Sequence, residues 1–464
     1  MISFRATDAV HWSGGELRRG TGDECFSGVS IDTRTVEPGQ LFVAIRGPSH
    51  DAHAFLDEAL GRGAAGLLIE RGTELPPDRG AAVVEVKDTT VALGALAAGH
   101  RESFLGPLVA ITGSNGKTTT KEMCAAILGV AAPCLKNPGN LNNEYGLPLT
   151  LLARGEEHRS VVVEIGMNHR GEIAPLAAIA RPTVGVITNV GTAHIEHLGS
   201  RDEIALEKGD LVAALGSEAT AILNADDPRV LSQRERSVAR VVTFGVAEEA
   251  DVRAERVTPL GDRGHAFDLV TGEGRLSVHV AGIGDTAIPN ALAAAAASLA
   301  AGASVSDVAE GLARYRPVGG RMEQMALPRN IIIINDTYNA NPQSMEVALR
   351  SLARLKGEAR GVAVLGDMGE LGGSAPDAHR EVGRLVAELG VDLLFVLGDH
   401  AREIQEAALA AGMDPGQVCR GEDHESLGRS VREILQGNDW VLVKGSRSMR
   451  MERVVLALTR EEKS

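Results

Sequence analysis

The chain contains very few aromatic residues, which together make up 3% of its 464 residues. Proteins that bind single-stranded nucleic acid without sequence preference stack the bases on such side chains, so the composition argues against that class. Basic residues are also outnumbered, because 47 lysines and arginines face 62 aspartates and glutamates. The resulting net charge of −15 disfavours polyanionic partners such as nucleic acid or an anionic membrane surface. A local pocket for an anion is still compatible with this balance.

Cysteine and long apolar runs are scarce as well. The four cysteines are scattered and form no C-x-x-C pair; they are Cys25, Cys124, Cys134 and Cys419. This pattern fits a reducing compartment better than a disulfide framework. No apolar run reaches the roughly eighteen residues of a membrane-spanning helix, and residues 1–20 lack the apolar segment of a secretory signal. We therefore expect a cytoplasmic protein that does not insert into a membrane.

Short apolar runs alternate with helix-like stretches along most of the chain. This alternation predicts an α/β protein with largely parallel sheets, and the length allows roughly two to four domains. We place the three domains at residues 1–88, 89–315 and 316–464. Strands are expected at the runs QLFVAIRG, AAVVEVKD, LVAIT, SVVVEIG, TVGVITNVG and ATAILNAD. In the third domain, the runs NIIIIND, RGVAVLGD, VDLLFVLGD and DWVLVKG predict a compact doubly wound sheet.

The stretch ITGSNGKTTT, residues 111–120, follows a predicted strand and begins a predicted helix. It resembles the phosphate-binding pattern G-x-x-x-x-G-K-[ST], but its first glycine stands two positions late, at Gly113. Gly113 and Gly116 allow backbone N–H groups to surround a phosphate, and the start of the helix adds a positive end. In this pattern Lys117 contacts the terminal phosphates and Thr118 holds Mg²⁺. We therefore predict a phosphate-binding loop of unusual spacing.

Three residues outside this loop have side chains of interest for phosphate chemistry. Glu164 closes the run SVVVEIG, and a carboxylate at that end of a strand beside a phosphate loop is a natural Mg²⁺ ligand. His194 follows another strand, but Mg²⁺ prefers oxygen ligands, and no zinc motif surrounds the histidine. From the residues alone, His194 is therefore structural, and Lys208 is an exposed lysine of a helix. The run GIGDTA gives only a weak dinucleotide fingerprint.

Two polar clusters follow strands of the third domain, in the runs NDTYNANPQS and VLVKGSRSM. The first has an unusual density of hydrogen-bonding side chains, even for a turn. The second combines lysine and arginine in a Gly-Ser turn, which suggests capture of an anion or a carboxylate. Because doubly wound sheets bind ligands at the carboxyl ends of their strands, both clusters are candidate ligand contacts. Their members are Asp336, Asn339, Asn341, Lys444, Ser446 and Arg447.

The order of these motifs resembles the Mur ligase family, which comprises ATP-dependent amide-bond ligases of peptidoglycan precursor synthesis. The resemblance extends over essentially the whole chain and rests on the blocks TGSNGKTTT, GNLNNEYGLPLTLL, EIGMNHRGEI, NDTYNANPQSMEVAL, GDMGELG and VKGSRSM. The blocks are most similar to those of the member that adds D-alanyl-D-alanine to UDP-N-acetylmuramoyl-tripeptide. The resemblance implies a UDP-substrate domain, a P-loop-type ATP-binding domain and a C-terminal Rossmann-like domain. We expect ATP, one or two Mg²⁺ ions and a monomer.

The resemblance also implies roles for individual residues. The expected catalytic residues are Lys117, Glu164, His194 and Lys208. The expected metal ligands are Thr118, Glu164, His194 and Lys208, with Lys208 carbamylated. The expected ATP-binding residues are Gly113, Ser114, Asn115, Gly116, Lys117, Thr118, Thr119, Asn143, Asn290, Arg321 and Asp336. The UDP-sugar end is assigned to Ser30, Thr33, Arg34, Asp51 and His53. The remaining substrate contacts are Asn339, Asn341, Lys444, Ser446 and Arg447.

The chain departs from the family pattern in one block. The family carries G-x-H-N-x-x-N-A-L before its Ala-rich helix, but Thr286 and Ala287 stand here in place of the His and Asn. This affects one expected adenine contact and leaves the expected chemistry unchanged, in which ATP activates a carboxylate as an acyl phosphate. Three alternatives stay open: a sister ligase that adds one amino acid, a folylpolyglutamate synthetase, and a nucleotide-binding regulator without catalysis. The third residue of the tripeptide, lysine or diaminopimelate, is not specified by the sequence.

Overall fold

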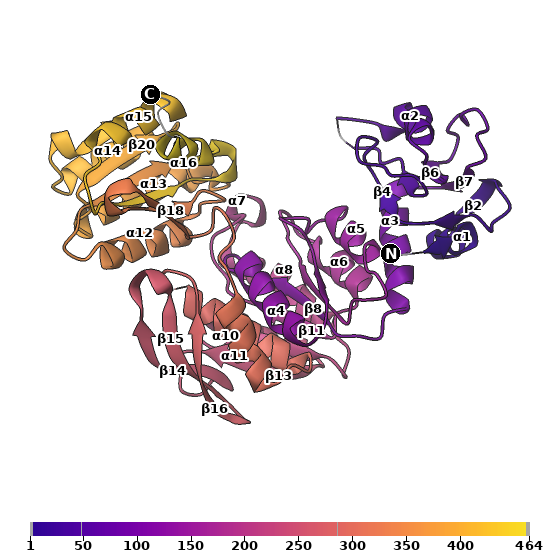
Figure 1. Ribbon diagram of the computed structural model, residues 1–464, viewed down its shortest axis with the longest axis horizontal. Coiled ribbons are helices and arrows are strands. Elements are labelled where there is room, and N and C mark those ends of the chain that lie inside the picture. The colour runs from indigo at the N-terminus through magenta and orange to yellow at the C-terminus, as the bar shows by residue number, and fades with distance from the viewer. Residues whose placement is uncertain (1–2, 48, 285, 461–464) are drawn as a thin grey trace.

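The computed structural model describes residues 3–47, 49–284 and 286–460, which form an α/β protein with three large sheets (Figure 1). The α/β fold class with three domains, expected from the sequence, is confirmed. The chain passes through the sheets in order, and the first and third parts lie apart, on either side of the central part (Figure 1). The domain boundaries at residues 88/89 and 315/316 stay predictions.

The first part of the chain folds into β1 (Phe4–Arg5), α1 (Ala6–Ser13), β2 (Glu16–Arg19), β3 (Cys25–Phe26), β4 (Val29–Ser30), β5 (Leu41–Val43), η1 (Ala52–Phe55), α2 (Leu56–Gly61), β6 (Gly66–Glu70) and β7 (Ala82–Val86). Its main sheet has the order β2–β7–β6–β5–β4, with only β2 antiparallel to its neighbour. Strands β1 and β3 form a separate antiparallel pair. All of β7 is buried, which explains why four of its five residues are apolar instead of alternating with polar ones, and its buried Glu85 pairs with Arg18.

The central part contains α3 (Thr89–Glu102), β8 (Leu108–Thr112), α4 (Lys117–Ala131), β9 (Cys134–Lys136), α5 (Gly146–Leu152), β10 (Ser160–Glu164), α6 (Ile173–Ala180), β11 (Val184–Ile187), α7 (Ile195–Leu198), α8 (Arg201–Ala213), β12 (Thr220–Asn224), α9 (Pro228–Leu231), β13 (Arg240–Gly245), β14 (Val252–Pro259), β15 (His265–Thr271), β16 (Gly274–Val280), α10 (Ala287–Ala300) and α11 (Val305–Arg314). The strand order is β16–β15–β14–β13–β12–β11–β8–β10–β9. From β9 to β14 the neighbours are parallel.

Helices cover both faces of the central sheet. One hydrophobic core includes residues of α4, α10 and α11, and the other includes residues of α3, α6 and α8. Helix α3 also packs on α1, so it connects the central part with the first part (Figure 1). The sequence analysis misses the antiparallel strands β15 and β16. Polar residues interrupt both strands, among them Asp268 in β15 and Arg275 and Ser277 in β16, so they lack the continuous apolar run that marks the buried parallel strands.

The third part folds into β17 (Glu323–Leu327), β18 (Ile331–Asp336), α12 (Pro342–Lys356), β19 (Gly361–Gly366), α13 (Ala375–Glu388), β20 (Leu393–Leu397), α14 (Ala401–Ala410), β21 (Val418–Arg420), α15 (His424–Ile434), β22 (Trp440–Lys444) and α16 (Glu452–Thr459). The order is β17–β18–β22–β19–β20–β21, and only β17 is antiparallel. Helices α12, α13 and α14 cover one face, and α15 and α16 cover the other. The doubly wound arrangement predicted for this part is confirmed.

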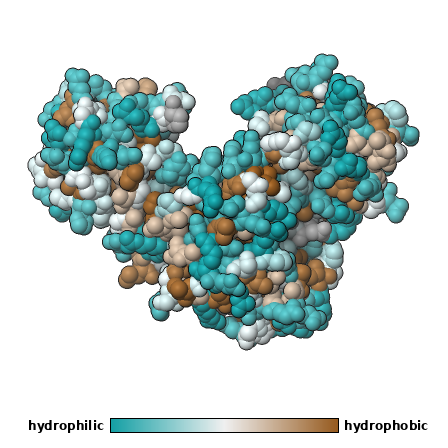
Figure 2. All heavy atoms as spheres, turned by 180° about the vertical axis from the view of Figure 1, so that it is seen from behind, coloured by the Kyte–Doolittle hydropathy of each residue, from teal (hydrophilic) through white to brown (hydrophobic). Residues whose placement is uncertain are grey.

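The surface in Figure 2 is mainly hydrophilic, and its hydrophobic residues occur singly or in small groups. The first and third parts appear there as separate lobes above the central part. Among the described residues, no helix combines the length and the apolar character that crossing a membrane requires.

Candidate active site

A large cleft of about 1300 Å³ lies between the central part and the third part. Its lining comes from the loop after β8, from the segments that follow β10 and β11, and from the loops after β18 and β22. These segments follow the carboxyl ends of parallel strands, where open α/β sheets bind ligands. The volume exceeds the roughly 300–1,000 Å³ of an ordinary small-molecule site, so the cleft has room for more than one ligand.

Two glycines give the loop after β8 its shape. Gly113 has a φ of +152° and Gly116 a φ of +83°, a region that residues with a side chain rarely adopt. A Cβ atom on Gly113 would lie 1.9 Å from Thr188 Oγ1, and one on Gly116 would lie 2.2 Å from Asn290 Oδ1. Both distances are far inside van der Waals contact, so the fold requires glycine at both positions.

The segment after β11 holds this loop in place. The backbone N–H of Ser114 donates to Asn189 O at 3.0 Å, and that of Asn115 donates to Asn189 Oδ1 at 2.9 Å. Thr188 Oγ1 donates to Asn115 O at 2.6 Å, and Gly191 N donates to Ser114 Oγ at 2.8 Å. The first N–H groups of α4 have no acceptor within their helix. They are therefore the donors that the loop offers to an anion.

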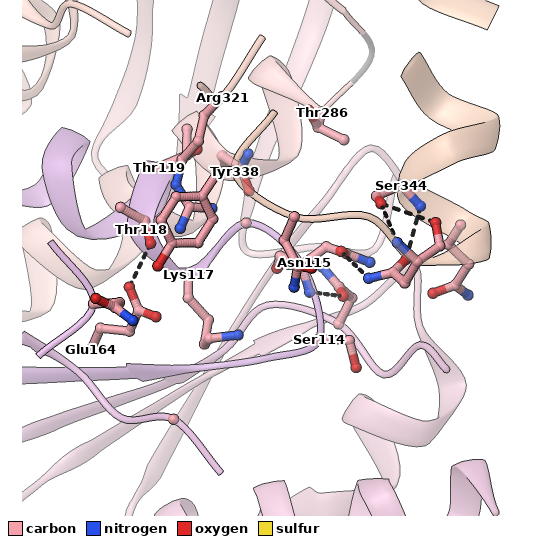
Figure 3. A pocket seen from close by; sticks show the side chains of 18 of the residues that line it. Ser114, Asn115, Lys117, Thr118, Thr119, Glu164, Thr286, Arg321, Tyr338 and Ser344 are labelled. Atoms are coloured by element: carbon pink, nitrogen blue, oxygen red, sulfur yellow. Dashed lines mark hydrogen bonds between the residues drawn. The ribbon is translucent and has the colours of Figure 1, made fainter. Parts of the chain in front are cut away.

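Lys117 begins α4, and its side chain turns back onto the loop (Figure 3). Its Nζ donates to Gly113 O at 2.8 Å. Burial lowers the pKa of Lys117, and the Glu164 carboxylate opposes that shift. The next two residues of the helix, Thr118 and Thr119, line the cleft together with Lys117. The predicted loop residues are thus gathered at one end of the cleft.

Glu164 lies beside the start of this helix. Thr118 Oγ1 donates to Glu164 Oε2 at 2.6 Å (Figure 3), and Asn142 Nδ2 donates to Glu164 Oε1 at 2.8 Å. The hydroxyl and the carboxylate are oxygen ligands of the type that Mg²⁺ prefers, and Mg²⁺ takes its other ligands from water and from substrate phosphates. Among the described residues, no three His, Cys, Asp or Glu side chains converge as a preformed metal site.

Sequence reasoning misses the network that positions Glu164. Lys121 of α4 is fully buried, and its Nζ donates to Asn137 O at 2.7 Å and to Gly139 O at 3.3 Å. Asn137 Oδ1 accepts from the backbone N–H of Glu164 at 2.9 Å. The asparagine-rich run GNLNNEYG, from which the sequence analysis takes Asn143, begins two residues after Asn137 and therefore points only to the neighbourhood of this network. Asn143 lines the cleft, but its side chain accepts from the N–H of Gly146 at 3.0 Å.

Lys208 is 1% exposed, so its interpretation as an exposed helix lysine is wrong. It shares a buried stripe of α8 with Ile204 and Leu211, which follow the i, i+4, i+7 spacing of one helix face. That spacing was the available signal. Burial holds the pKa of Lys208 well below its ordinary value, and the charge of Lys117 lowers it further. Lys208 lines the cleft.

Glu207, the neighbour of Lys208, fixes the segment that follows β10. Its carboxylate accepts hydrogen bonds from the backbone N–H groups of Gly171, Glu172 and Ile173 at 2.7, 3.0 and 2.9 Å. These donors stand at the start of α6, whose positive end favours a carboxylate. This contact could not be predicted from local spacing because the two segments are 35 residues apart.

His194 lines the cleft and contacts the third part of the chain. Its Nδ1 lies 2.6 Å from Glu370 Oε2, and Glu370 belongs to the loop after β19. The contact with the His194 side chain holds the pKa of Glu370 below its ordinary value, against the effect of burial. Glu370, in the block GDMGELG, was not selected as a site residue.

The third part brings its predicted polar residues, except Ser446, to the cleft, where several of them are paired. Lys444 is 2% exposed, and its Nζ donates to Asp336 Oδ2 at 2.5 Å and to Asn339 O at 2.9 Å. Asn341 Nδ2 donates to Asn115 Oδ1 of the phosphate loop at 2.8 Å. The ammonium of Lys444 is therefore committed to Asp336, whereas Asn341 joins the two parts of the chain.

Arg321 and Tyr338 form a second pair at the rim of the loop (Figure 3). The guanidinium carbon of Arg321 lies 3.9 Å from the ring centroid of Tyr338, within the range of a cation–π contact. Arg447 lines the cleft and is exposed, whereas Ser446 is buried and bonds to Ser448. The predicted nucleotide contact Asn290, together with Thr286 and Ala287, also lines the cleft.

The five residues predicted to bind the UDP end lie on the first part of the chain, away from the residues that line the cleft. His53 Nδ1 lies 2.6 Å from Asp51 Oδ1, and His53 Nε2 accepts from the N–H of Glu70 at 3.0 Å. Arg34 pairs with Asp32. The other two are Ser30 and Thr33, both buried. The structure thus gathers the ATP and metal candidates in one cleft and keeps the UDP candidates on another sheet.

A glycine loop at the carboxyl end of a parallel sheet, with a buried carboxylate beside it and a second α/β unit across the cleft, defines a nucleotide-binding α/β protein of several domains. Residues 111–298 match the family model described as Mur ligase middle domain. Residues 320–447 match the model described as Mur ligase, glutamate ligase domain. The chain belongs to the Mur ligase family.

Three relatives illustrate the likeness. The UDP-N-acetylmuramoyl-tripeptide–D-alanyl-D-alanine ligase of Escherichia coli is 37% identical over 99% of both chains. A crystal structure of MurF from Acinetobacter baumannii superposes with a TM-score of 0.89 and 32% identity over 99% of both chains. A MurF ligase of Thermotoga maritima, solved in complex with ADP, has a TM-score of 0.82 and 28% identity over 93% of this chain and 96% of that one.

Proposed function

We propose that this chain is an ATP-dependent ligase that joins D-alanyl-D-alanine to UDP-N-acetylmuramoyl-tripeptide in peptidoglycan precursor synthesis. The observation that carries the proposal is the 37% identity to the E. coli ligase over 99% of both chains, a span that includes the phosphate loop and the residues lining the cleft. A monomer acting in the cytoplasm is part of the same proposal.

The chemistry follows from what an amide bond needs. A carboxylate reacts poorly with an amine because its oxygen is a poor leaving group. Transfer of the γ-phosphoryl group of ATP to the tripeptide carboxylate gives an acyl phosphate and ADP. The amine nitrogen of D-alanyl-D-alanine then forms the new C–N bond, phosphate leaves with the electrons of the C–O bond, and the nitrogen releases a proton. No enzyme nucleophile is needed, and none is assigned.

The phosphate loop is assigned to the phosphates of ATP. Lys117 and the N–H groups at the start of α4 offset the charge that develops on the transferred phosphoryl group. Thr118 and Glu164 are the proposed ligands of Mg²⁺, which supplies further positive charge at the phosphates. The hydrogen bond between these two side chains, 2.6 Å long, supports the assignment because it holds both oxygens at one place.

Lys208 is proposed to act as a carbamate. Carbon dioxide reacts with a neutral amine, and burial favours the neutral form of this lysine. The added carboxylate would convert a buried cation into an oxygen ligand, so that Lys208 would join Glu164 and His194 around Mg²⁺. A carbamate that binds a metal ion suits this position better than an ammonium group, because Lys208 is only 1% exposed.

The remaining roles follow the two sides of the cleft. The proposed nucleotide contacts are Gly113, Ser114, Asn115, Gly116, Thr119, Asn143, Asn290, Arg321 and Asp336. The proposed contacts with the peptide substrates are Asn339, Asn341, Lys444, Ser446 and Arg447. The UDP-sugar end is assigned to Ser30, Thr33, Arg34, Asp51 and His53. The substrate would then reach from the first sheet to the cleft, which places its reacting carboxylate near the phosphate loop.

The test is an assay of phosphate release with purified enzyme, ATP, Mg²⁺ and UDP-N-acetylmuramoyl-tripeptide ending in lysine or diaminopimelate. We expect release that depends on D-alanyl-D-alanine, together with a product whose mass equals tripeptide plus dipeptide minus water. Release with a single amino acid instead would favour a sister ligase. ATP binding without any acceptor-dependent release would favour a regulator without catalysis.

A further inference from the structure

The contact between His194 and Glu370 joins two parts of the chain across the cleft. His194 follows β11 of the central sheet, and Glu370 follows β19 of the third sheet. Their side chains lie 2.6 Å apart, from Nδ1 to Oε2. Both residues have a positive φ, +65° for His194 and +59° for Glu370. Residues with side chains adopt this region seldom and chiefly where the surrounding structure imposes it.

The loop that carries Glu370 is tied firmly to the third sheet. His379 of α13 is fully buried; its Nδ1 bonds to Ala375 O at 2.7 Å, and its Nε2 accepts from the backbone N–H of Met368 at 3.0 Å. On the other side, Ser446 N donates to Asp367 O at 2.8 Å. Because these bonds fix the loop, the position of Glu370 follows the position of the third sheet.

The group that faces Nδ1 of His194 determines whether the other ring nitrogen, Nε2, has a free lone pair. The contact is close but lacks the alignment of a hydrogen bond, with 2.6 Å between Nδ1 and the carboxylate oxygen. A proton on Nδ1 is still favoured over a lone pair there, because a carboxylate has only lone pairs to present. Nε2 of the neutral ring then carries the free lone pair. A carboxylate that holds the opposite nitrogen of a metal-binding histidine fixes both the tautomer and the direction of the ring.

We propose that Glu370 is a positioning residue that orients His194 for metal binding only when the third sheet is docked on the central part. The proposal rests on the proposed function, because it takes His194 as a ligand of Mg²⁺. It adds a link between the central and third parts of the chain. When the third sheet docks, the Glu370 carboxylate comes to lie beside His194 and orients its ring, and this completes the metal site. Nucleotide and metal would therefore bind to a complete site only when the third sheet is docked on the central part.

The first test measures metal binding without turnover. Mn²⁺ is titrated into the enzyme with saturating ADP and followed by its electron paramagnetic resonance signal. Glu370→Ala is expected to weaken Mn²⁺ binding by about 10–100-fold, the usual effect of removing a residue that orients a ligand. Glu370→Gln should recover most of the affinity, since its carbonyl oxygen can still face Nδ1. Glu196→Gln is the matched control, because its exposed carboxylate stands two residues from His194.

The second test asks whether Glu370 acts through His194. If it does, adding Glu370→Ala to His194→Ala should lower Mn²⁺ affinity and kcat by less than about twofold beyond His194→Ala alone. If the two substitutions instead lower Mn²⁺ affinity independently, so that their effects add in the double variant, the proposal is overturned. Unchanged Mn²⁺ binding in Glu370→Ala, including the case in which only the KM for D-alanyl-D-alanine rises, would also overturn it. Failure of the unmodified enzyme to ligate would refute the proposed function instead, and the Mn²⁺ titration would still decide the role of Glu370.

Discussion

Thr118 Oγ1 donates a hydrogen bond of 2.6 Å to Glu164 Oε2, and this bond joins the phosphate loop to the neighbouring strand of the sheet. Glu164 is 2% exposed. A buried carboxylate is costly unless it is hydrogen-bonded, and here Asn142 supplies a second donor at 2.8 Å. The carboxylate is therefore held at the start of α4, where both the helix dipole and a bound cation have their strongest effect.

Replacing Lys117 by alanine is expected to abolish ligation and to leave the fold intact. The ammonium is the side-chain cation of the phosphate loop, and its loss removes charge that stabilises the transferred phosphoryl group. We expect kcat to fall by about a thousandfold or more, with the circular dichroism spectrum and the melting temperature near those of the unmodified chain. Near-normal turnover would show that the loop does not have the assigned role.

Replacing Lys208 by alanine is expected to give a weak enzyme that small carboxylates or bicarbonate partly restore. The variant lacks the amine that carries the carbamate, and an added carboxylate can occupy the space left beside the cleft. Burial holds the pKa of Lys208 well below its ordinary value, which favours the neutral amine that reacts with carbon dioxide. Mass spectrometry of the unmodified chain tests for the added carbon dioxide. Full activity of the variant without any additive would remove the carbamate from the mechanism.

The sequence was most informative where the fold imposes a local rule. Gly113 and Gly116 stand at positive φ beside Thr188 and Asn290, so only glycine fits there, and the pattern is visible in the sequence. Buried parallel strands such as β8 are continuous apolar runs for the same kind of reason. Where one backbone position admits only one residue type, the sequence is sufficient to predict the local structure.

Contacts between distant segments were harder to foresee. Glu370 and His194 are brought together only by the docking of two sheets, and Lys121 meets Asn137 only through the packing of a helix on a loop. Lys208 is an intermediate case, because the spacing from Ile204 to Leu211 predicts a buried stripe, although a lysine is rarely placed on one. Residue types and local spacing do not encode which side chains meet across a cleft.

Replacing Lys121 by methionine is expected to slow the reaction although Lys121 does not line the cleft. Its ammonium holds the loop of Asn137 and Gly139, and methionine leaves those carbonyls without their donor, at a cost of about 1–3 kcal/mol. The loop then no longer fixes Glu164, so we expect kcat to fall by about tenfold. Lys136 pairs with Glu122, which also lies 3.2 Å from Lys121 Nζ, so the control is Lys87→Met, at an exposed position before α3. Equal kinetics in both variants would contradict the prediction.

Acid should destabilise the protein through His100, which lies buried on α3 with its ring 6.4 Å from that of Trp12 and tilted by 60°. Burial, together with the charge of Arg154, lowers the pKa of His100 to about 4 from an ordinary 6.5. The unfolded chain therefore takes up a proton first, so stability is kept above pH 6.5 and is lost as the pH falls toward 4, by about 2 kcal/mol between pH 7 and 5. Urea unfolding at both pH values should show a smaller loss for His100→Gln than for the unmodified chain. His11→Gln, at an exposed position of α1, should behave like the unmodified chain, and equal losses in all three would refute the assignment.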